Sequence, residues 1–207
     1  PTFAKETIYA YISDGGIQEE ISQGAARVAA TLGLDNLIMF YDSNSVQLST
    51  DCDEVTSEDV AAKYKAWDWF VLEIDGNDPD AIREALKQAK AEDKRPTLII
   101  GKTVMGKGAL RADGTSYAAC INTYGAPLGG DAYINTVKNL GGNPEEPFVL
   151  FEETKEIYAR RREELKGIVA ERYAAKAEWA KANPEKAAKM EKWFSGAAPE
   201  VDWSGLI

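Results

Sequence analysis

Histidine is absent from this chain of 207 residues. Its absence removes the side chain that most often transfers protons at neutral pH, so an enzyme built on this sequence must do without an imidazole or obtain one from elsewhere. Cysteine is scarce as well, because only Cys52 and Cys120 occur and they form no Cys-x-x-Cys pair. We interpret both thiols as small packing residues, and the sequence offers neither a zinc site nor a disulfide framework.

Long apolar runs and an excess of positive charge are missing too. The longest runs, Leu37–Tyr41 and Thr97–Ile100, are far too short to span a bilayer, and no signal peptide is visible. The net charge of −10 argues against nucleic-acid binding. We therefore expect a cytoplasmic protein without membrane or nucleic-acid partners, which must bind any phosphate group through backbone N–H groups or a bound cation.

Strand and helix patterns alternate along the first two-thirds of the chain. The strand patterns are apolar nearly throughout, which is typical of strands buried on both faces, and they lie at Thr7–Ser13, Leu37–Tyr41, Trp69–Ile74 and Thr97–Lys102. The helix patterns lie at Gln18–Leu32, at Ser57–Ala66 with a cap at Thr56 or Ser57, and at Pro79–Glu92. This alternation predicts an α/β fold, a parallel sheet with helices on both faces.

The last third of the chain has a different character. An irregular, glycine-rich segment from Gly106 to Gly130 and a short helix at 131–140 precede a break at Gly141–Pro144. A long charged helix at 154–183 and a shorter one after Pro184 follow the break. We predict a partial α/β domain over residues 1–145 and a helical linker or tail over residues 146–207.

Polar residues follow the first two predicted strands. Asp14-Gly15-Gly16 ends the first strand and Asp42–Val46 ends the second, at the sheet edge where α/β proteins bind ligands. The carboxylate of Asp14, the amide oxygen of Asn44 and a loop carbonyl suit a hard divalent cation. Two structural alternatives stay open, since Asp14 is also a plausible helix cap and Asn44 a plausible turn residue.

Several segments resemble the transketolases, a family of thiamine-diphosphate enzymes. The resemblance begins at the Gly-Asp-Gly…Asn motif, which reads here YISDGGIQEEISQGAARVAATLGLDNLIMFYDSNSVQL. It continues through EIDGNDPDAIREALKQAKAEDKRPTLIIGKTVMGKGA, INTYGAPLGG and FVLFEETKEIYARRREELK. Nearly the whole chain is covered, and the resemblance implies part of the thiamine diphosphate-binding fold followed by a helical linker.

The resemblance also implies a set of residues around the diphosphate end of thiamine diphosphate. The ligands of Mg²⁺ (or Ca²⁺) would be Asp14, Asn44 and the carbonyl of Val46. The cofactor-binding residues would be Asp14, Gly15, Glu19, Asn44, Leu48, Lys102 and Tyr124. Among these, the N–H of Gly15 would bind the diphosphate, Leu48 would lie near the thiazolium ring, and Glu19 near the contact between paired active sites. For two of them an alternative to cofactor binding stays open: Lys102 is also a plausible solvated residue at a strand end, and Tyr124 a plausible packing residue.

In the family, a two-carbon ketol unit passes from a ketose phosphate to an aldose phosphate, a reaction of the pentose phosphate pathway. The implied partners are sugar phosphates, the remaining transketolase domains and a second copy in a dimer. The chain departs from the family pattern where glycines become Ser13 and Ser45, and where Gln23, Asn77 and Tyr124 stand at positions that often carry histidine.

The chain resembles only the second half of the diphosphate domain plus the interdomain linker. The activating glutamate belongs to a pyrimidine-binding domain outside this sequence, and we expect no catalytic residue within it. The expected function is therefore the metal–diphosphate anchor of a transketolase, inactive by itself. The alternative is a non-catalytic binding or interaction module that retains the same fold.

Overall fold

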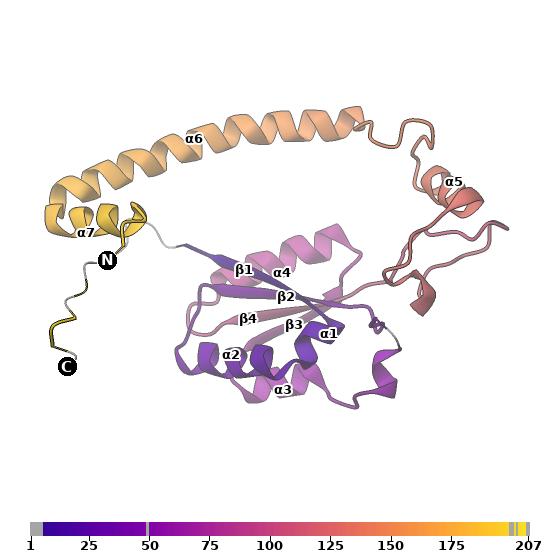
Figure 1. The fold of residues 1–207 in the computed structure, drawn as a ribbon, viewed down its shortest axis with the longest axis horizontal. Helices are drawn as coiled ribbons and strands as arrows, with labels where there is room; N and C mark the ends of the chain where they lie inside the picture. Colours follow the sequence, from indigo (N-terminus) through magenta and orange to yellow (C-terminus); the bar gives the residue numbers. More distant parts are fainter. Residues whose placement is uncertain (1–5, 49, 199–200, 202, 206–207) are drawn as a thin grey trace. The chain divides into compact units, whose positions relative to one another are not determined.

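The computed structural model describes residues 6–48, 50–198, 201 and 203–205 (Figure 1). The chain divides into two compact units, Glu6–Val149 and a second one that includes Leu150–Ile207. Each unit is described by itself below. The predicted division of the chain after residue 145 stays a prediction.

A sheet of four parallel strands forms the centre of the first unit. Its strands are β1 (Ile8–Ser13), β2 (Leu37–Ser43), β3 (Phe70–Asp75) and β4 (Thr97–Lys102), in the order β1-β2-β4-β3. The register pairs Ser13 with Asp42 and Ser43 with Lys102. The carboxyl ends of β1, β2 and β4 therefore meet at one edge, and the predicted parallel α/β sheet is confirmed.

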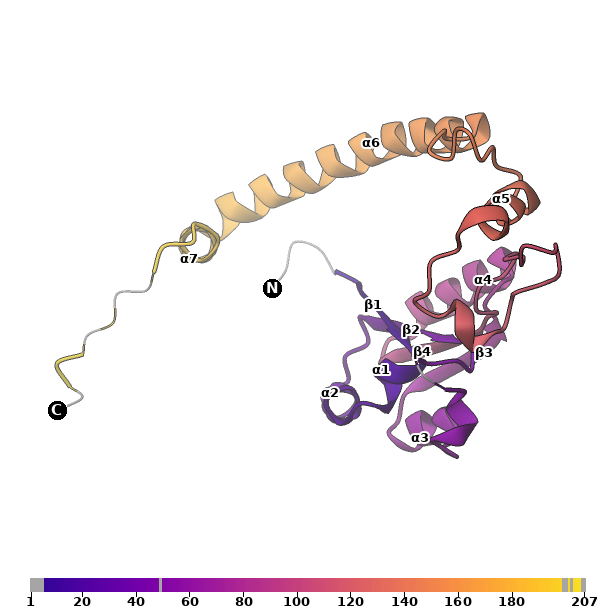
Figure 2. The same ribbon diagram turned by 45° about the vertical axis from the view of Figure 1, so that its right-hand side comes forward.

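Helices cover both faces of this sheet (Figures 1 and 2). The helices α1 (Asp14–Gln18), α2 (Glu20–Thr31) and α3 (Val60–Ala66) lie on one face, and α4 (Pro79–Ala91) lies on the other. Successive residues of a strand point to opposite faces. Met39 and Tyr41 of β2 accordingly join the core under α2 and α3, whereas Ile38 joins the core under α4. Two apolar cores explain why β2 and β4 are apolar nearly throughout. The predicted burial on both faces is wrong for the edge strand β1, in which Ile8, Tyr9 and Tyr11 are each more than half exposed.

The structure corrects two predicted helix boundaries. The continuous helix predicted over Gln18–Leu32 is interrupted at Glu19, whose ψ of 132° is extended. At this break the side-chain amide of Gln23 donates a 2.9 Å hydrogen bond to the carbonyl of Gln18, which replaces a helical backbone bond. The predicted cap at Thr56 or Ser57 is wrong, because α3 begins after Asp59, whose carboxylate accepts a 2.9 Å hydrogen bond from the Ala62 N–H.

Three shorter elements complete the first unit, namely the 3-10 turns η1 (Cys52–Glu54) and η2 (Ile121–Thr123) and the helix α5 (Gly130–Asn139). The glycine-rich segment is attached to α5, since the Leu110 N–H donates to the hydroxyl of Thr136 at 2.9 Å. The second unit contains α6 (Glu152–Ala182) and α7 (Pro184–Phe194). Within the described ranges, no helix combines the length and the apolarity needed to cross a membrane.

Tyr64 of α3 is fully buried, and its hydroxyl has no hydrogen-bond partner among the described residues. Its ring packs against Trp67 and Trp69, with centroids 4.9 and 5.3 Å away. Burial raises the pKa of Tyr64 to about 12, compared with about 10 in an unfolded chain. The folded state therefore disfavours ionisation, and the stability linked to this group is present below pH 10 and lost as the pH rises towards 12.

We predict that Tyr64→Phe raises the free energy of unfolding by about 1 kcal/mol, because it removes a buried hydroxyl without a partner and keeps the ring contacts. The variant should also lose less stability than the parent between pH 10 and pH 12. Denaturant unfolding at several pH values measures both effects. Tyr173→Phe, at an exposed site on α6, is the control; a destabilised Tyr64→Phe would contradict the prediction.

The loop after β2 contains a residue in the left-handed region, Ser45, with φ of 65°. Two backbone hydrogen bonds of 3.0 Å hold this loop, from Cys52 N–H to the Ser45 carbonyl and from Gln47 N–H to the Thr50 carbonyl. The left-handed conformation costs an L-residue roughly 1–2 kcal/mol. The loop thus retains a conformation that glycine adopts without that cost.

We predict that Ser45→Gly stabilises the protein by about 0.5 kcal/mol, since relief of the left-handed strain exceeds the added freedom of the unfolded chain. Ser45→Val should destabilise it by more than about 1 kcal/mol, because a branched side chain is an outlier there. Chemical denaturation measures both. Ser57→Gly, at a residue without positive φ, is the control and should be mildly destabilising. If Ser45→Gly and Ser57→Gly changed the free energy of unfolding in the same direction, the backbone strain at Ser45 would be refuted.

Candidate functional site

Asp14 connects the ends of β1 and β2. It directly follows β1 as the first residue of α1 and is only 3% exposed. One carboxylate oxygen accepts a 2.7 Å hydrogen bond from the hydroxyl of Tyr41, and the other accepts a 2.9 Å bond from the N–H of Asn44. A buried charge is costly unless it is paired, and no described cationic side chain pairs with Asp14.

Asn44 and Val46 offer two further oxygen atoms on the loop after β2. The side-chain oxygen of Asn44 accepts a 3.0 Å hydrogen bond from the Val46 N–H, which forms an Asx turn. An amide oxygen has two lone pairs, so that of Asn44 can bind a second partner. Among the described residues, none donates a hydrogen bond to the Val46 carbonyl. A carboxylate, an amide and a carbonyl oxygen therefore fit a hard cation such as Mg²⁺ or Ca²⁺.

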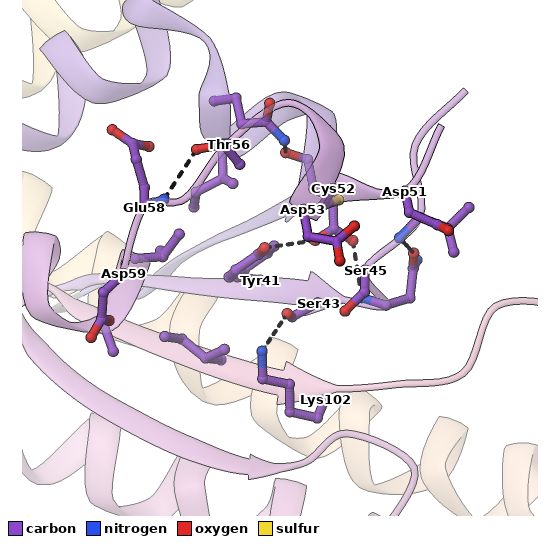
Figure 3. Close-up of a pocket in the computed structure, with 18 of the residues that line it drawn as sticks. Tyr41, Ser43, Ser45, Asp51, Cys52, Asp53, Thr56, Glu58, Asp59 and Lys102 are labelled. Atoms are coloured by element: carbon purple, nitrogen blue, oxygen red, sulfur yellow. Dashed lines mark hydrogen bonds between the residues drawn. The ribbon is translucent and has the colours of Figure 1, made fainter. Parts of the chain in front are cut away.

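A cavity of about 520 Å³ lies at this end of the sheet (Figure 3). Four of the predicted residues line it, namely Asp14, Asn44, Val46 and Lys102. Most of its charged lining is acidic: Asp14, Asp51, Asp53, Glu58, Asp59 and Glu73. An acidic wall repels a diphosphate unless a cation lies between them.

Lys102 is the only positively charged residue among the described residues that line the cavity. It ends β4, and its ammonium group donates a 2.9 Å hydrogen bond to the hydroxyl of Ser43 on the adjacent strand (Figure 3). An ammonium group has three donors, so two remain for other partners. This geometry is compatible with an anion in the cavity.

The other predicted residues do not line this cavity. Gly15 lies in the first turn of α1, where the leading N–H groups lack helical acceptors, and a Cβ placed on it would meet no atom within 4 Å. Glu19 is exposed at the break between α1 and α2. Leu48 is 73% exposed, and a Cβ on Gly125 would lie 3.8 Å from its Cδ1. Leu48 is therefore close to the loop of Tyr124, which is half-buried after η2.

Sequence reasoning missed three residues that touch Asp14 or its backbone, namely Tyr41, Gln18 and Cys52. Tyr41 could have been found, because it ends an apolar run and its alternation places it on the same face as Ser43. Gln18, whose amide donates to the Asp14 carbonyl at 3.0 Å, gave no recognisable signal. Cys52 also lines the cavity, but burial and the charge of Asp14 raise the pKa of its thiol to about 11. It is therefore a protonated thiol at neutral pH and a weak nucleophile.

The part of the chain that the structure describes contains no group of three or more His, Cys, Asp or Glu side chains able to hold a metal ion. The predicted ligand set includes a single carboxylate beside an amide and a backbone carbonyl. It therefore requires only one side chain of those four types.

Comparison with known proteins identifies the family. The family model described as "Transketolase, thiamine diphosphate binding domain" matches residues 2–199. Transketolase 1 of Pasteurella multocida is 37% identical over 199 residues, which is 95% of this chain and 28% of that protein. The transketolase of Kluyveromyces lactis is 41% identical over 152 residues, 72% of this chain and 21% of that protein. The chain thus spans less than a third of the curated relatives it matches.

Solved structures agree with the sequence match. A Pichia stipitis transketolase in complex with sedoheptulose 7-phosphate superimposes with a TM-score of 0.86 at 30% identity, over 96% of this chain and 29% of that one. The transketolase of Campylobacter jejuni gives a TM-score of 0.80 at 29% identity, over 98% of this chain and 31% of that one. The sheet, the two helical layers and the sequence match lead to one conclusion: the chain belongs to the transketolase family and corresponds to part of its thiamine diphosphate-binding domain.

Proposed function

We propose that this chain anchors thiamine diphosphate through a divalent cation, as part of a transketolase that transfers a two-carbon ketol unit between sugar phosphates. Residues 1–145 would form the diphosphate-binding part, and residues 146–207 the helical linker to further domains. The cation would be Mg²⁺ or Ca²⁺.

One observation carries the proposal, namely the buried carboxylate of Asp14 among neutral donors at the edge of an acidic cavity. Its oxygens accept hydrogen bonds from the Tyr41 hydroxyl and the Asn44 N–H, and the Cys52 thiol is a further neutral donor. A divalent cation bound by Asp14, Asn44 and the Val46 carbonyl would compensate the buried charge. The same cation would turn a cavity that repels phosphate into one that binds it.

The bound cofactor would supply the carbon–carbon chemistry, and the chain would bind and orient it. The Gly15 N–H and the two remaining donors of Lys102 would bind diphosphate oxygens that the cation leaves free. Leu48 would contact the thiazolium end together with the loop that carries Tyr124. Glu19, exposed beside the α1–α2 break, would face a second active site.

The complete enzyme requires more than this chain, which spans 28% of the Pasteurella relative. We propose that the remaining transketolase domains, or a second copy in a dimer, supply the proton-transfer groups that a chain without histidine lacks. Sugar phosphates would be the substrates, in line with the solved relative that holds sedoheptulose 7-phosphate. The pentose phosphate pathway and the cytoplasm would be its setting.

A second candidate function is a non-catalytic module that keeps the fold and loses the reaction. The observation that favours it is the absence of histidine from the whole sequence, including position 124, where the tyrosine cannot become cationic. Such a module would bind the cofactor, or a partner chain, without turning over sugar phosphates.

Calorimetric titration with thiamine diphosphate tests the anchor. We expect binding that requires Mg²⁺, and Asn44→Ala should weaken it by about 10- to 100-fold through loss of a ligand. Asn36→Ala makes the same change just before the amino end of β2 and should leave the affinity unchanged. No heat at excess Mg²⁺, or equal affinity of Asn44→Ala and the parent chain, would refute the assignment.

An assay of ketol transfer separates the two candidate functions. The chain alone should convert no ketose phosphate and aldose phosphate above the buffer rate, because it lacks an imidazole for proton transfer. Mixing it with a chain that supplies the remaining transketolase domains should restore turnover if it is part of a transketolase. Cofactor binding without restored turnover would support the non-catalytic module, and turnover by the chain alone would contradict both accounts.

A further inference from the structure

Gln18 connects Asp14 to the loop that carries the other two proposed ligands. It is the last residue of α1, is half-buried and lines the cavity. Its side-chain nitrogen donates one hydrogen bond to the Asp14 carbonyl at 3.0 Å and another to the side-chain oxygen of Gln47 at 3.2 Å. An amide nitrogen has two hydrogens, so both are used, one on each side of the site.

We propose that Gln18 is a positioning residue that holds the Asn44–Gln47 loop in register with Asp14. This inference rests on the proposed function and adds to it a residue that never touches the cation. Gln47 directly follows Val46, and the Gln18–Gln47 bond joins positions 29 residues apart in the sequence. A shift of the loop against α1 would change the distance between Asp14 and the two other ligands. Residues that hold metal ligands in place commonly matter almost as much as the ligands.

Gln18 is itself held by a second amide. The helix breaks at Glu19, and the side-chain nitrogen of Gln23 donates to the Gln18 carbonyl at 2.9 Å across that break. Gln23 is 8% exposed, so its amide is fixed by the core beneath α2. Gln23 thus holds the backbone of Gln18, and the side chain of Gln18 holds Gln47 in the loop.

The chemistry of this connection suits an acidic cavity. An uncharged amide donates two hydrogen bonds without adding negative charge near Asp14, Asp51 and Asp53. A lysine would place a positive charge beside the site and repel the cation, and a glutamate would repel the Asp14 carbonyl. Glutamine makes both hydrogen bonds, to the Asp14 carbonyl and to Gln47, without adding a charge of either sign.

The test compares Gln18→Met, Gln47→Met and the double variant in the full chain. Methionine keeps the length of the side chain and removes the amide. Hydrogen exchange of the Asn44 and Val46 amides, whose bonds run to Asp14 and Asn44, should accelerate by about tenfold in Gln18→Met. The dissociation constant for thiamine diphosphate with Mg²⁺ should rise by about tenfold. The double variant should be no worse than Gln18→Met, because the two residues share one bond.

Gln88→Met on the exposed side of α4 is the matched control and should change neither quantity. If Gln18→Met fails to fold, Gln47→Met tests the same bond from the loop. Unchanged exchange at Asn44 and Val46 would overturn the proposal, as would equal acceleration across the whole sheet, which would mean a purely structural role. If the parent chain binds no cofactor, the proposed function fails, whereas the exchange rates still decide whether Gln18 positions the loop.

Discussion

The buried carboxylate of Asp14 is the constraint on which the site depends. Its hydrogen bonds to the Tyr41 hydroxyl and the Asn44 N–H join the ends of two adjacent parallel strands. This arrangement is possible because the register places Ser13 beside Asp42. Neutral donors compensate a buried charge only in part. In the proposed function, a divalent cation would complete the compensation and would allow a diphosphate to bind in a cavity that is otherwise acidic.

The surrounding fold holds this arrangement between two apolar cores. Apolar strands bury both faces of the sheet under α2 and α3 on one side and α4 on the other, so polar side chains collect at the strand ends. There the loop after β2 is shaped by the left-handed Ser45 and the Asx turn of Asn44. The amide of Gln18 connects that loop to α1.

Much of this arrangement could be predicted from the sequence, because it depends on local periodicity. The apolar run of Leu37–Tyr41 and the polar residues after it indicated a buried strand with Asn44 at its end, and β4 matches its predicted bounds of Thr97–Lys102. The break at Glu19 and the start of α3 after Asp59 were not predictable in this way. The break depends on the hydrogen bond that the Gln23 side chain donates across it. The start of α3 depends on the local cap at Asp59, which competed in the sequence with Thr56 and Ser57. The bond between Tyr41 and Asp14 is likewise a contact between residues 27 positions apart.

The central claim is that three oxygen ligands from two strand ends hold one cation together with thiamine diphosphate. The most direct measurement is a crystal structure of the chain grown with Ca²⁺ and thiamine diphosphate, with anomalous scattering used to locate the metal. The account predicts a calcium peak about 2.3–2.6 Å from the oxygens of Asp14, Asn44 and Val46, with diphosphate oxygens completing its coordination. A cofactor bound without metal contact to Asp14, or a calcium ion coordinated elsewhere, would contradict it.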